Sequence, residues 1–497
     1  MHAPAGHPQL GALRARGAGS LAAAALAALL AAFYAGSFEI DFYGDDYVFL
    51  DRARLDSAGD WPVWFSLERN REGLLDRHHA YRPLSTNVWF GTLHALFGAD
   101  ARCFHAANLA LLWLNALLLW RLLARFCASR ALGLALAGVY AISSVGFEGQ
   151  LWLSVVQDLL LTTGVLASWL CYERHRERPS ARALAALLAW QLAALLSKET
   201  ALVLPLLLLL REAWCGERAG AAWRPRLLAL ASSALLAGGF AWFRIAGFGL
   251  PAAGPYALGA GEHALPNLAR YASWAGQSLF FAREPWLLLA ALLAAALCAF
   301  RGGTRSARRF GLGLSCFAAA LLPVLFLRAH AYPFYLTLPL VGLVLAAAAS
   351  LEALGARLPA RLRLPLAAAA LCAFAWLSFA RLEQRLAPLV ARSALTRGIL
   401  AQLRERLPEL PRGARLYFER PATLPRDTLF KHRGAVLRVL YDDDSLRVFE
   451  LDPRDPEAPF ALRHGPAPIL RLDAQGRLEL LEPARADRPP AAGDALR

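Results

Sequence analysis

The sequence is poor in charge for its length. Only 18% of its 497 residues are Asp, Glu, Lys or Arg, whereas 57% are hydrophobic. A soluble protein of this size needs a more polar surface than this composition offers. Long apolar segments alternate instead with short clusters of arginine. This pattern excludes an ordinary soluble domain and predicts a polytopic α-helical membrane protein.

Cysteine is scarce in the part of the chain where a stabilising disulfide would be useful. None of the seven cysteines follows Cys372, and only Cys103 lies near a loop expected outside the membrane. A disulfide in an exported C-terminal domain is therefore not expected, and no cysteine spacing resembles a zinc site. The sequence also has no internal repeat, which weakens the case for a transporter built from inverted repeats.

Basic residues exceed acidic ones and give a formal net charge of +15. Such an excess often indicates nucleic-acid binding, but here the arginines follow every second apolar segment, as the positive-inside rule requires. The clusters are Arg121, Arg125 and Arg130; Arg174, Arg176, Arg178 and Arg182; Arg218, Arg224 and Arg226; Arg301, Arg305, Arg308 and Arg309; and Arg357, Arg361 and Arg363. The pattern predicts a cytoplasmic N-terminus, an outer C-terminal tail and no nucleic-acid partner.

About eleven segments are expected to cross the bacterial inner membrane. They lie near residues 17–38, 104–121, 131–147, 157–172, 183–197, 200–213, 227–246, 285–300, 310–327, 332–350 and 364–380. The first could instead be a signal peptide, since arginines precede a run of small residues. Its length and the many spans that follow favour a span. Residues 1–380 are thus expected to form a transmembrane domain.

Two loops and the tail are expected outside the membrane. Residues 39–103 form a long first outer loop with juxtamembrane helices, because its tryptophans suit the membrane interface. Residues 247–284 form a second long outer loop, rich in Gly and Pro. Residues 381–497 form a small, mainly β periplasmic domain with a disordered end. Helix is expected up to Leu410, followed by strands in ARLYFE, AVLRVLY, LRVFEL, PILRLD and RLELLE, with a hairpin turn at DAQG.

The most informative polar residues are Asp45 and Asp46, in FYGDDYVFL after the first span. Adjacent carboxylates at the exit of a span can accept a proton, orient a hydroxyl or hold a cation. The alternative is an N-cap and a solvated loop charge at the start of a juxtamembrane helix. A divalent metal is not favoured, because GDD supplies two ligands and no clear third.

Other unusual polar residues fall on the same expected outer side. They are Arg82, Glu148, Asp158, Lys198, Glu199, Arg328, His330 and Tyr335. Lys198, between two apolar runs, has three interpretations: snorkelling to the interface, an ion pair with Glu199 that fixes a helix turn, or a cation that neutralises a phosphate. Carboxylates beside cations suit transfer of a group from an anionic lipid donor to a hydroxyl.

Six segments resemble the polytopic glycosyltransferases of the GT-C class. The closest likeness is to the membrane half of the tetratricopeptide-containing O-mannosyltransferases and their bacterial relatives. The segments are GDDYVFL, YRPLSTNVWF, FHAANLALLWLNALLLW, GFEGQLWLSVVQDLLLTTGVLA, LLSKETALVLPLLLL and LLPVLFLRAHAYPFYLTLPLVGLVLA. They occur in the family's order and cover roughly residues 20–350.

The resemblance implies a polyprenyl-phosphate-linked sugar donor, an inverting transfer and an active site on the outer face. It makes Asp45 or Asp46 the catalytic base. It places Glu148 and Asp158 in a second acidic motif. It implies that Lys198 and Arg328 bind the donor phosphate. The neighbouring polar residues Arg82, Glu199, His330 and Tyr335 are expected to take part in binding the donor phosphate or the substrate.

Three departures leave the acceptor open among a lipid, a cell-surface glycan and an exported protein. Ser143-Ser144 replaces the family's H-P, Val156 or Gln157 replaces an arginine, and no tetratricopeptide repeats follow. The alternative function is a transporter or flippase of a lipid-linked glycan, which would require charged or broken spans at the membrane midplane.

Overall fold

The structure is a computed structural model that describes residues 8–71, 80–216, 223–250, 256–259, 261–419, 434–450, 469–473 and 475–481. The chain divides into two compact units. The helical unit comprises Met1–Ile40 and Leu55–Ala387, and the C-terminal unit comprises Asp41–Arg54 and Pro388–Arg497. The segment that carries Asp45 and Asp46 thus belongs to the same compact unit as the C-terminal sheet.

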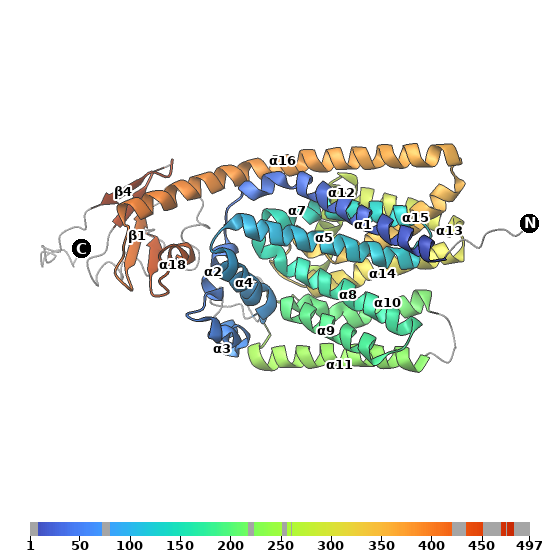
Figure 1. Ribbon diagram of the computed structural model, residues 1–497, viewed down its shortest axis with the longest axis horizontal. Helices are drawn as coiled ribbons and strands as arrows, with labels where there is room; N and C mark the ends of the chain where they lie inside the picture. Colours follow the sequence, from blue (N-terminus) through green and yellow to red (C-terminus); the bar gives the residue numbers. More distant parts are fainter. Residues whose placement is uncertain are drawn as a thin grey trace, which may run out of the picture. The chain divides into compact units, whose positions relative to one another are not determined.

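The helical unit is built from long apolar helices joined by short helical turns (Figure 1). Its elements are α1 (Pro8–Phe33), η1 (Ala35–Glu39), η2 (Ala58–Phe65), α3 (Leu67–Arg71), η3 (Leu84–Val88), α4 (Trp89–Phe97), α5 (Ala101–Phe126), α6 (Arg130–Ala141), α7 (Ser144–Leu151), η4 (Leu153–Val155), α8 (Val156–Glu177), α9 (Ala181–Ser197), η5 (Glu199–Val203), α10 (Leu204–Cys215), α11 (Trp223–Phe248), α12 (Ala264–Phe280), α13 (Pro285–Arg301), α14 (Thr304–Leu325), η6 (Pro333–Leu336) and α15 (Pro339–Arg357). The helix α16 (Ala360–Arg406) begins in this unit and continues into the C-terminal unit.

The prediction of a polytopic α-helical membrane protein is confirmed. Each of the eleven predicted segments falls on a helix. Among the described residues, six helices are long and apolar enough to cross a membrane, or up to eight if each of two bent helix pairs is one span. The bent pairs are α6 with α7, at 53°, and α12 with α13, at 64°. The segments at 183–197 and 200–213 lie on α9 and α10, which have only 17 and 12 residues.

Burial distinguishes central helices from peripheral ones. In the most apolar stretch of α8, 89% of residues are buried, against 22% for α11. Helix α8 therefore packs among other helices, chiefly α5 and α9, while α11 leaves most of its apolar surface for lipid.

Helices α14 and α15 approach so closely that their backbones touch. A Cβ atom added to Gly313 would lie 2.4 Å from the Ala346 nitrogen, and one added to Gly342 would lie 2.4 Å from the Phe317 nitrogen. Small residues allow such contacts between membrane helices. The glycines therefore set the distance between the two helices.

The predicted second outer loop, 247–284, contains a regular helix. Within it, α12 buries Asn267, Tyr271 and Ala275, which are four residues apart and therefore share one face. The Gly- and Pro-rich segment before α12 masks this pattern in the sequence. Residues 251–255 and 260 of the predicted loop lie outside the described residues.

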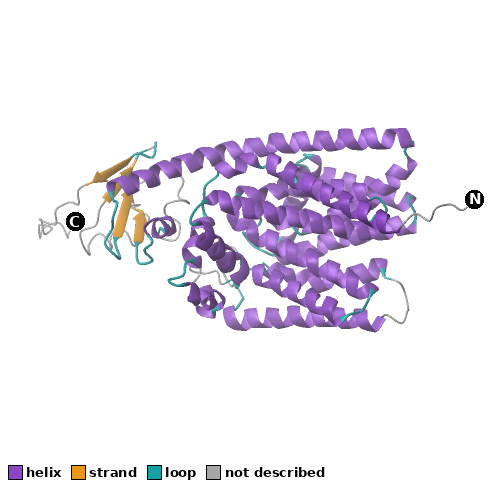
Figure 2. Cartoon of the chain, viewed as in Figure 1, coloured by secondary structure: helices purple, strands orange, loops and turns teal. Residues whose placement is uncertain are grey.

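The C-terminal unit contains a four-stranded sheet and short helices (Figure 2). The strands are β1 (Arg415–Glu419), β2 (Arg447–Glu450), β3 (Ile469–Leu472) and β4 (Leu478–Leu481), in the order β2-β1-β3-β4. Strand β1 pairs in parallel with β2 and β3, and β3 pairs antiparallel with β4. The predicted hairpin at DAQG is confirmed by the β3–β4 pair. The predicted disordered end lies outside the described residues.

The strand predicted in AVLRVLY is wrong, because these residues form the helix α18 (Ala435–Tyr441). Gly434 before it and Asp442 after it both adopt left-handed backbone conformations, which limit the helix to seven residues. Parallel strands also need a crossover connection, commonly helical, and α18 lies between the parallel strands β1 and β2. The other short helix of this unit, α2 (Asp45–Ala53), packs against α18.

Candidate active site

Arg82, from the predicted first outer loop, forms a two-pronged ion pair with Glu199. Its Nε lies 2.7 Å from Oε2 of Glu199, and its Nη2 lies 2.5 Å from Oε1. Its Nη1 donates a third hydrogen bond, of 2.5 Å, to Oε1 of Gln157 on α8. Burial by itself would raise the pKa of the Glu199 carboxyl, but the Arg82 guanidinium outweighs this effect and holds the pKa below its ordinary value. Glu199 therefore stays ionised and fixes the guanidinium plane.

Lys198, the residue before Glu199, belongs to a second ion pair. Its Nζ lies 2.6 Å from Oδ2 of Asp158 in the first turn of α8, and both side chains are at most 5% exposed. The Lys198 backbone is extended, with φ −162° and ψ 134°, and ends α9 before the turn η5 begins. The break in the helix therefore lets two consecutive residues join two different ion pairs.

This geometry overturns two of the sequence interpretations of Lys198. The side chain does not snorkel, because it is 2% exposed and its ammonium contacts Asp158. The pair between Lys198 and Glu199 does not form either, since Glu199 pairs with Arg82. Removing a charge from water costs several kcal/mol per ion, so these ion pairs add little net free energy to the stability of the fold. Buried ionisable groups in membrane helices are typical of functional sites.

Aromatic rings surround these two ion pairs. The Lys198 Nζ lies 4.3 Å from the ring centre of Tyr335 and 5.2 Å from that of Phe334, both on η6. The rings of Tyr256 and His330 lie 4.0 Å apart, the rings of His330 and Tyr335 lie 5.8 Å apart, and the Arg82 guanidinium lies 5.9 Å from the Tyr256 ring. We call this group the cation–aromatic cluster: Arg82, Asp158, Lys198, Glu199, Tyr256, His330, Phe334 and Tyr335.

Arg328 lies beside the cluster and is exposed. Residues 256–259 form a short antiparallel bridge with residues 326–328, in which the Arg328 backbone N–H donates a 3.0 Å hydrogen bond. This bridge brings Tyr256 and His330, which are far apart in the sequence, into ring contact. The structure thus gathers the predicted phosphate- and substrate-binding residues of the helical unit at one end of α8, α9 and α14.

Glu148 and Asp158, predicted together as the second acidic motif, have different partners. Glu148 on α7 is buried and pairs with Arg385 on α16, whereas Asp158 pairs with Lys198. Only Asp158 belongs to the cation–aromatic cluster.

Asp45 and Asp46 occupy the first turn of α2, within the C-terminal unit. Gly44 before them is the N-cap, and its φ of 60° suits glycine. Asp46 is fully buried, and its Oδ2 accepts a 3.1 Å hydrogen bond from the Tyr43 backbone N–H. Asp45 is half-buried. The two neighbours therefore differ: Asp46 helps to order the start of the helix, and Asp45 is the more accessible carboxylate.

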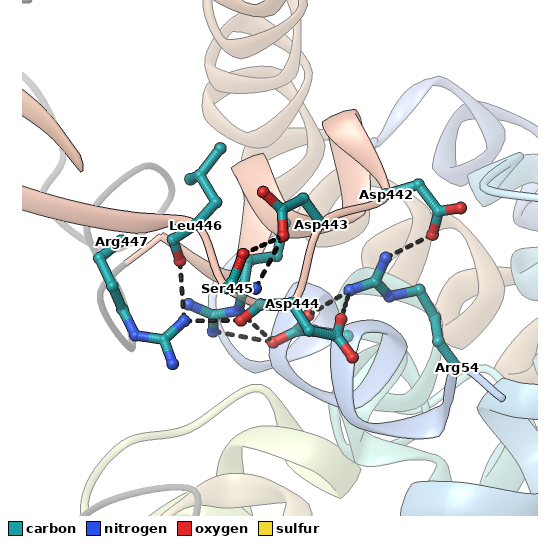
Figure 3. Close-up of polar contacts among 9 residues, drawn as sticks. Arg54, Asp442, Asp443, Asp444, Ser445, Leu446 and Arg447 are labelled. Carbon is teal, nitrogen blue, oxygen red and sulfur yellow. Dashed lines mark hydrogen bonds and ion pairs between the residues drawn. The ribbon is translucent and has the colours of Figure 1, made fainter. Parts of the chain in front are cut away.

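Two arginines connect α2 with α18 and the turn after it, within the C-terminal unit. Arg54, directly after α2, lies 2.6 Å from Asp442 and also pairs with Asp444 (Figure 3). Arg438 of α18 lies 2.8 Å from Asp51 of α2, and both side chains are largely buried. Water screens the Arg54 pairs, because Asp442 is 91% exposed, so the Arg438–Asp51 pair contributes more to the attachment.

The sequence gives no signal for Tyr256 or Arg438 as parts of these arrangements. Gln157 follows Glu148 among the polar residues of the expected outer side, and either it or Val156 stands where the family resemblance expects an arginine. The sequence does not indicate its hydrogen bond with Arg82. Among the residues that the structure describes, no group of three or more His, Cys, Asp or Glu side chains is arranged to hold a metal ion.

The chain was compared with protein-family models, curated proteins and solved structures. No protein-family model and no curated protein matches the chain. Among solved structures, the chain is similar to ArnT from Cupriavidus metallidurans bound to undecaprenyl phosphate, with 13% identity, a TM-score of 0.52, and coverage of 91% of this chain and 92% of ArnT. A second similar structure is the oligosaccharyltransferase AglB from Archaeoglobus fulgidus in complex with an inhibitory peptide and a dolichol-phosphate (9% identity, TM-score 0.47, covering 94% of this chain and 75% of AglB).

The likeness to ArnT extends over nearly the whole length of both chains and shows a shared fold. ArnT is a glycosyltransferase of the GT-C class. The resemblance to that class is therefore confirmed at the level of the fold.

Proposed function

We propose, from the fold shared with ArnT, that this chain is a glycosyltransferase that moves a sugar from a polyprenyl-phosphate-linked donor to an acceptor hydroxyl. The reaction takes place on the outer face of the bacterial inner membrane, with the N-terminus in the cytoplasm and the C-terminal unit in the periplasm. The observation that carries the proposal is the cation–aromatic cluster, in which two buried cations gather at one end of the helical unit. ArnT binds undecaprenyl phosphate, which is the class of lipid that we assign to the donor.

The cations of the helical unit are assigned to the donor phosphate. A guanidinium carries five N–H donors, of which Arg82 uses three in the bonds described above. Lys198 has three donors and uses one on Asp158. Both therefore keep N–H groups for phosphate oxygens, and exposed Arg328 supplies a further cation. Charge on the leaving phosphate is stabilised because these groups are already held in place.

The sugar is assigned to the aromatic part of the cluster. Tyr256, His330 and Tyr335 offer ring faces and polar edges next to the phosphate-binding cations. Glu199 and Asp158 hold the cations in position and do not take part in proton transfer.

Asp45 is assigned the role of the base, and Asp46 that of positioning the acceptor. The acceptor oxygen attacks C1 of the sugar, the bond between C1 and the phosphate oxygen breaks, and polyprenyl phosphate leaves. The acceptor proton passes to the Asp45 carboxylate, and attack from the side opposite the leaving group inverts C1. The greater accessibility of Asp45 supports its assignment as the base.

A transporter or flippase of a lipid-linked glycan is the second candidate function. Charged residues near the middle of the spans would favour it. On α8, however, the buried charges Asp158 and Glu173 lie near the two ends, and residues 159–172 carry no charge. The middle of this span therefore carries no charge, which disfavours a transport site at the membrane midplane.

The test compares lipids and glycans by mass spectrometry in a strain that lacks the gene and in complemented strains. We expect the deletion to remove one sugar from an envelope lipid, glycan or exported protein, and wild type to restore it. Asp45→Asn should insert into the membrane normally and fail to restore the sugar. Asp56→Asn, an exposed carboxylate of the same outer loop, is the matched control and should restore it.

Full restoration by both Asp45→Asn and Asp46→Asn would contradict the base assignment. A flippase would instead move a fluorescent polyprenyl-phosphate sugar across vesicles of the purified protein without forming a new glycosidic bond.

A further inference from the structure

A cavity of about 380 Å³ lies at the end of the helical unit opposite the cation–aromatic cluster. It opens where α13 ends, α14 begins and α15 ends. The cluster lies beyond the other end of α14, whose 22 residues span about 33 Å at the usual helical rise. The cavity therefore belongs to the opposite membrane face, which the arginine pattern assigns to the cytoplasm.

Four of the nine residues that line the cavity are arginines. Its charged lining residues are four arginines and one glutamate: Arg301, Arg305, Arg309, Arg357 and Glu352. Oε2 of Glu352 lies 3.0 Å from Nη1 of Arg309, and Oε1 accepts a 2.7 Å hydrogen bond from the Ala128 backbone N–H. Both oxygens of Glu352, the only carboxylate in the lining, therefore already have partners.

The other three arginines, Arg301, Arg305 and Arg357, have no ion-pair partner among the carboxylates that the structure describes. Elsewhere at this end of the unit some arginines have such partners, as Arg125 does in Glu177 and Arg176 in Glu212, whereas Arg178 and Arg182 have none among the described carboxylates. The feature that distinguishes Arg301, Arg305 and Arg357 is that they line one cavity together.

The local fold brings these arginines together. Only Gly302 and Gly303 separate α13 from α14, and the φ of Gly303 is 93°. A Cβ atom added to Gly302 would lie 2.6 Å from Cβ of Ala353 on α15, so this turn lies directly against α15. As a result, Nη2 of Arg357 reaches the Arg301 carbonyl at 2.6 Å. The turn between α13 and α14 therefore brings Arg301 next to Arg357 of α15.

The surface that leads to the cavity is apolar. Leu293, Leu297 and Phe300 on α13, just before Arg301, are 63%, 50% and 67% exposed. A soluble anion gains nothing from such a surface, whereas the acyl chain of a lipid does. Basic pockets at the cytoplasmic ends of membrane helices suit anionic lipid headgroups.

We propose that this cavity binds the phosphate headgroup of an anionic phospholipid of the cytoplasmic leaflet, with an acyl chain along α13. Arg301, Arg305 and Arg357 contact the phosphate oxygens, and Arg309 is held in place by Glu352. This lipid is distinct from the donor, because it lies at the other membrane face.

The experiment is native mass spectrometry of the purified full chain in detergent with added phosphatidylglycerol. Wild type is compared with Arg301→Gln/Arg305→Gln. The matched control is Arg178→Gln/Arg182→Gln, two exposed arginines beside the α8–α9 turn at the same end of the unit. We expect the pocket variant to bind the lipid about 30-fold more weakly, which corresponds to about 1 kcal/mol for each arginine. The control variant should bind like wild type.

Two further measurements distinguish the sources of the phosphate. Phosphatidylethanolamine at the same concentration should not bind, and millimolar inorganic phosphate should not displace phosphatidylglycerol. Arg357→Gln provides a second variant if the double variant does not fold, and it should weaken binding in the same direction. Equal loss of lipid in pocket and control variants, or full displacement by inorganic phosphate, would overturn the proposal.

Discussion

Replacing Lys198 with methionine tests whether the buried pair with Asp158 serves the fold, the reaction or both. Methionine keeps the length of the side chain and removes its charge, which leaves the Asp158 carboxylate alone in a site where it is 5% exposed. Breaking a buried pair in this way costs about 3–5 kcal/mol. The ammonium also loses its contacts with the rings of Tyr335 and Phe334, which contribute about 0.5–2 kcal/mol. We therefore expect Lys198→Met to be destabilised by roughly 4 kcal/mol.

The double variant Lys198→Met/Asp158→Leu removes both charges. Replacing a whole buried pair with apolar side chains of similar volume is often neutral or stabilising. The double variant should therefore recover most of the loss, at least about 2 kcal/mol relative to Lys198→Met. The assay is reversible unfolding in mixed micelles of detergent and SDS, followed by far-UV circular dichroism. A double variant as unstable as Lys198→Met would refute the reasoning, because the single variant would then leave no uncompensated charge behind.

Sugar transfer by the double variant separates the two roles of Lys198. If the ammonium contacts the donor phosphate, the double variant should be stable and inactive. A double variant that restores the missing sugar as well as wild type would limit Lys198 to a structural role.

Two further substitutions test the ion pair of Glu199 with Arg82 and the contact between α14 and α15. The pKa of Glu199 is lowered in the folded protein, so its ion pair with Arg82 stabilises the fold above the unfolded pKa, near 4.3, and loses this effect as the pH falls through the folded value. Glu199→Gln should therefore reduce the free energy of unfolding by about 3 kcal/mol at both pH 6 and pH 8, and a difference that changed between these two values in SDS titrations would contradict the assignment. Gly342→Ala places a Cβ atom 2.4 Å from the Phe317 nitrogen and should destabilise the fold by about 1–3 kcal/mol. Gly239→Ala on α11, where nothing lies within 4 Å, is the control and should leave the thermal midpoint within a degree or two of wild type or raise it.

The helices of this fold could be predicted from the sequence because each depends only on the residues of its own segment. An apolar segment of suitable length must form a helix in lipid, since every backbone group needs a partner. AVLRVLY was assigned wrongly for the opposite reason. Seven residues do not distinguish a helical from a strand pattern, and the parallel pairing that calls for a crossover helix depends on strands distant in the sequence.

The candidate residues could be listed from the sequence, but their partners could not. Arg82 and Glu199 are 117 residues apart, and no local pattern links them. A pair between Lys198 and Glu199 was one of three interpretations that the sequence left open, yet the extended backbone at Lys198 gives each residue a different partner. The difference between Asp45 and Asp46 likewise depends on the turn at Gly44, which buries only the second carboxylate.

The glycine contact between α14 and α15 has a consequence for how far such sequences can diverge. Where two backbones touch, the distance between helices does not depend on the identity of the surrounding side chains. Most positions along these helices can then exchange one apolar residue for another without moving the ends, where Tyr335 and Arg301 lie. The chain shares the fold of ArnT at 13% identity. Distant members of this fold should be easier to find by the spacing of small residues, such as that of Gly313 and Gly342, than by overall sequence identity.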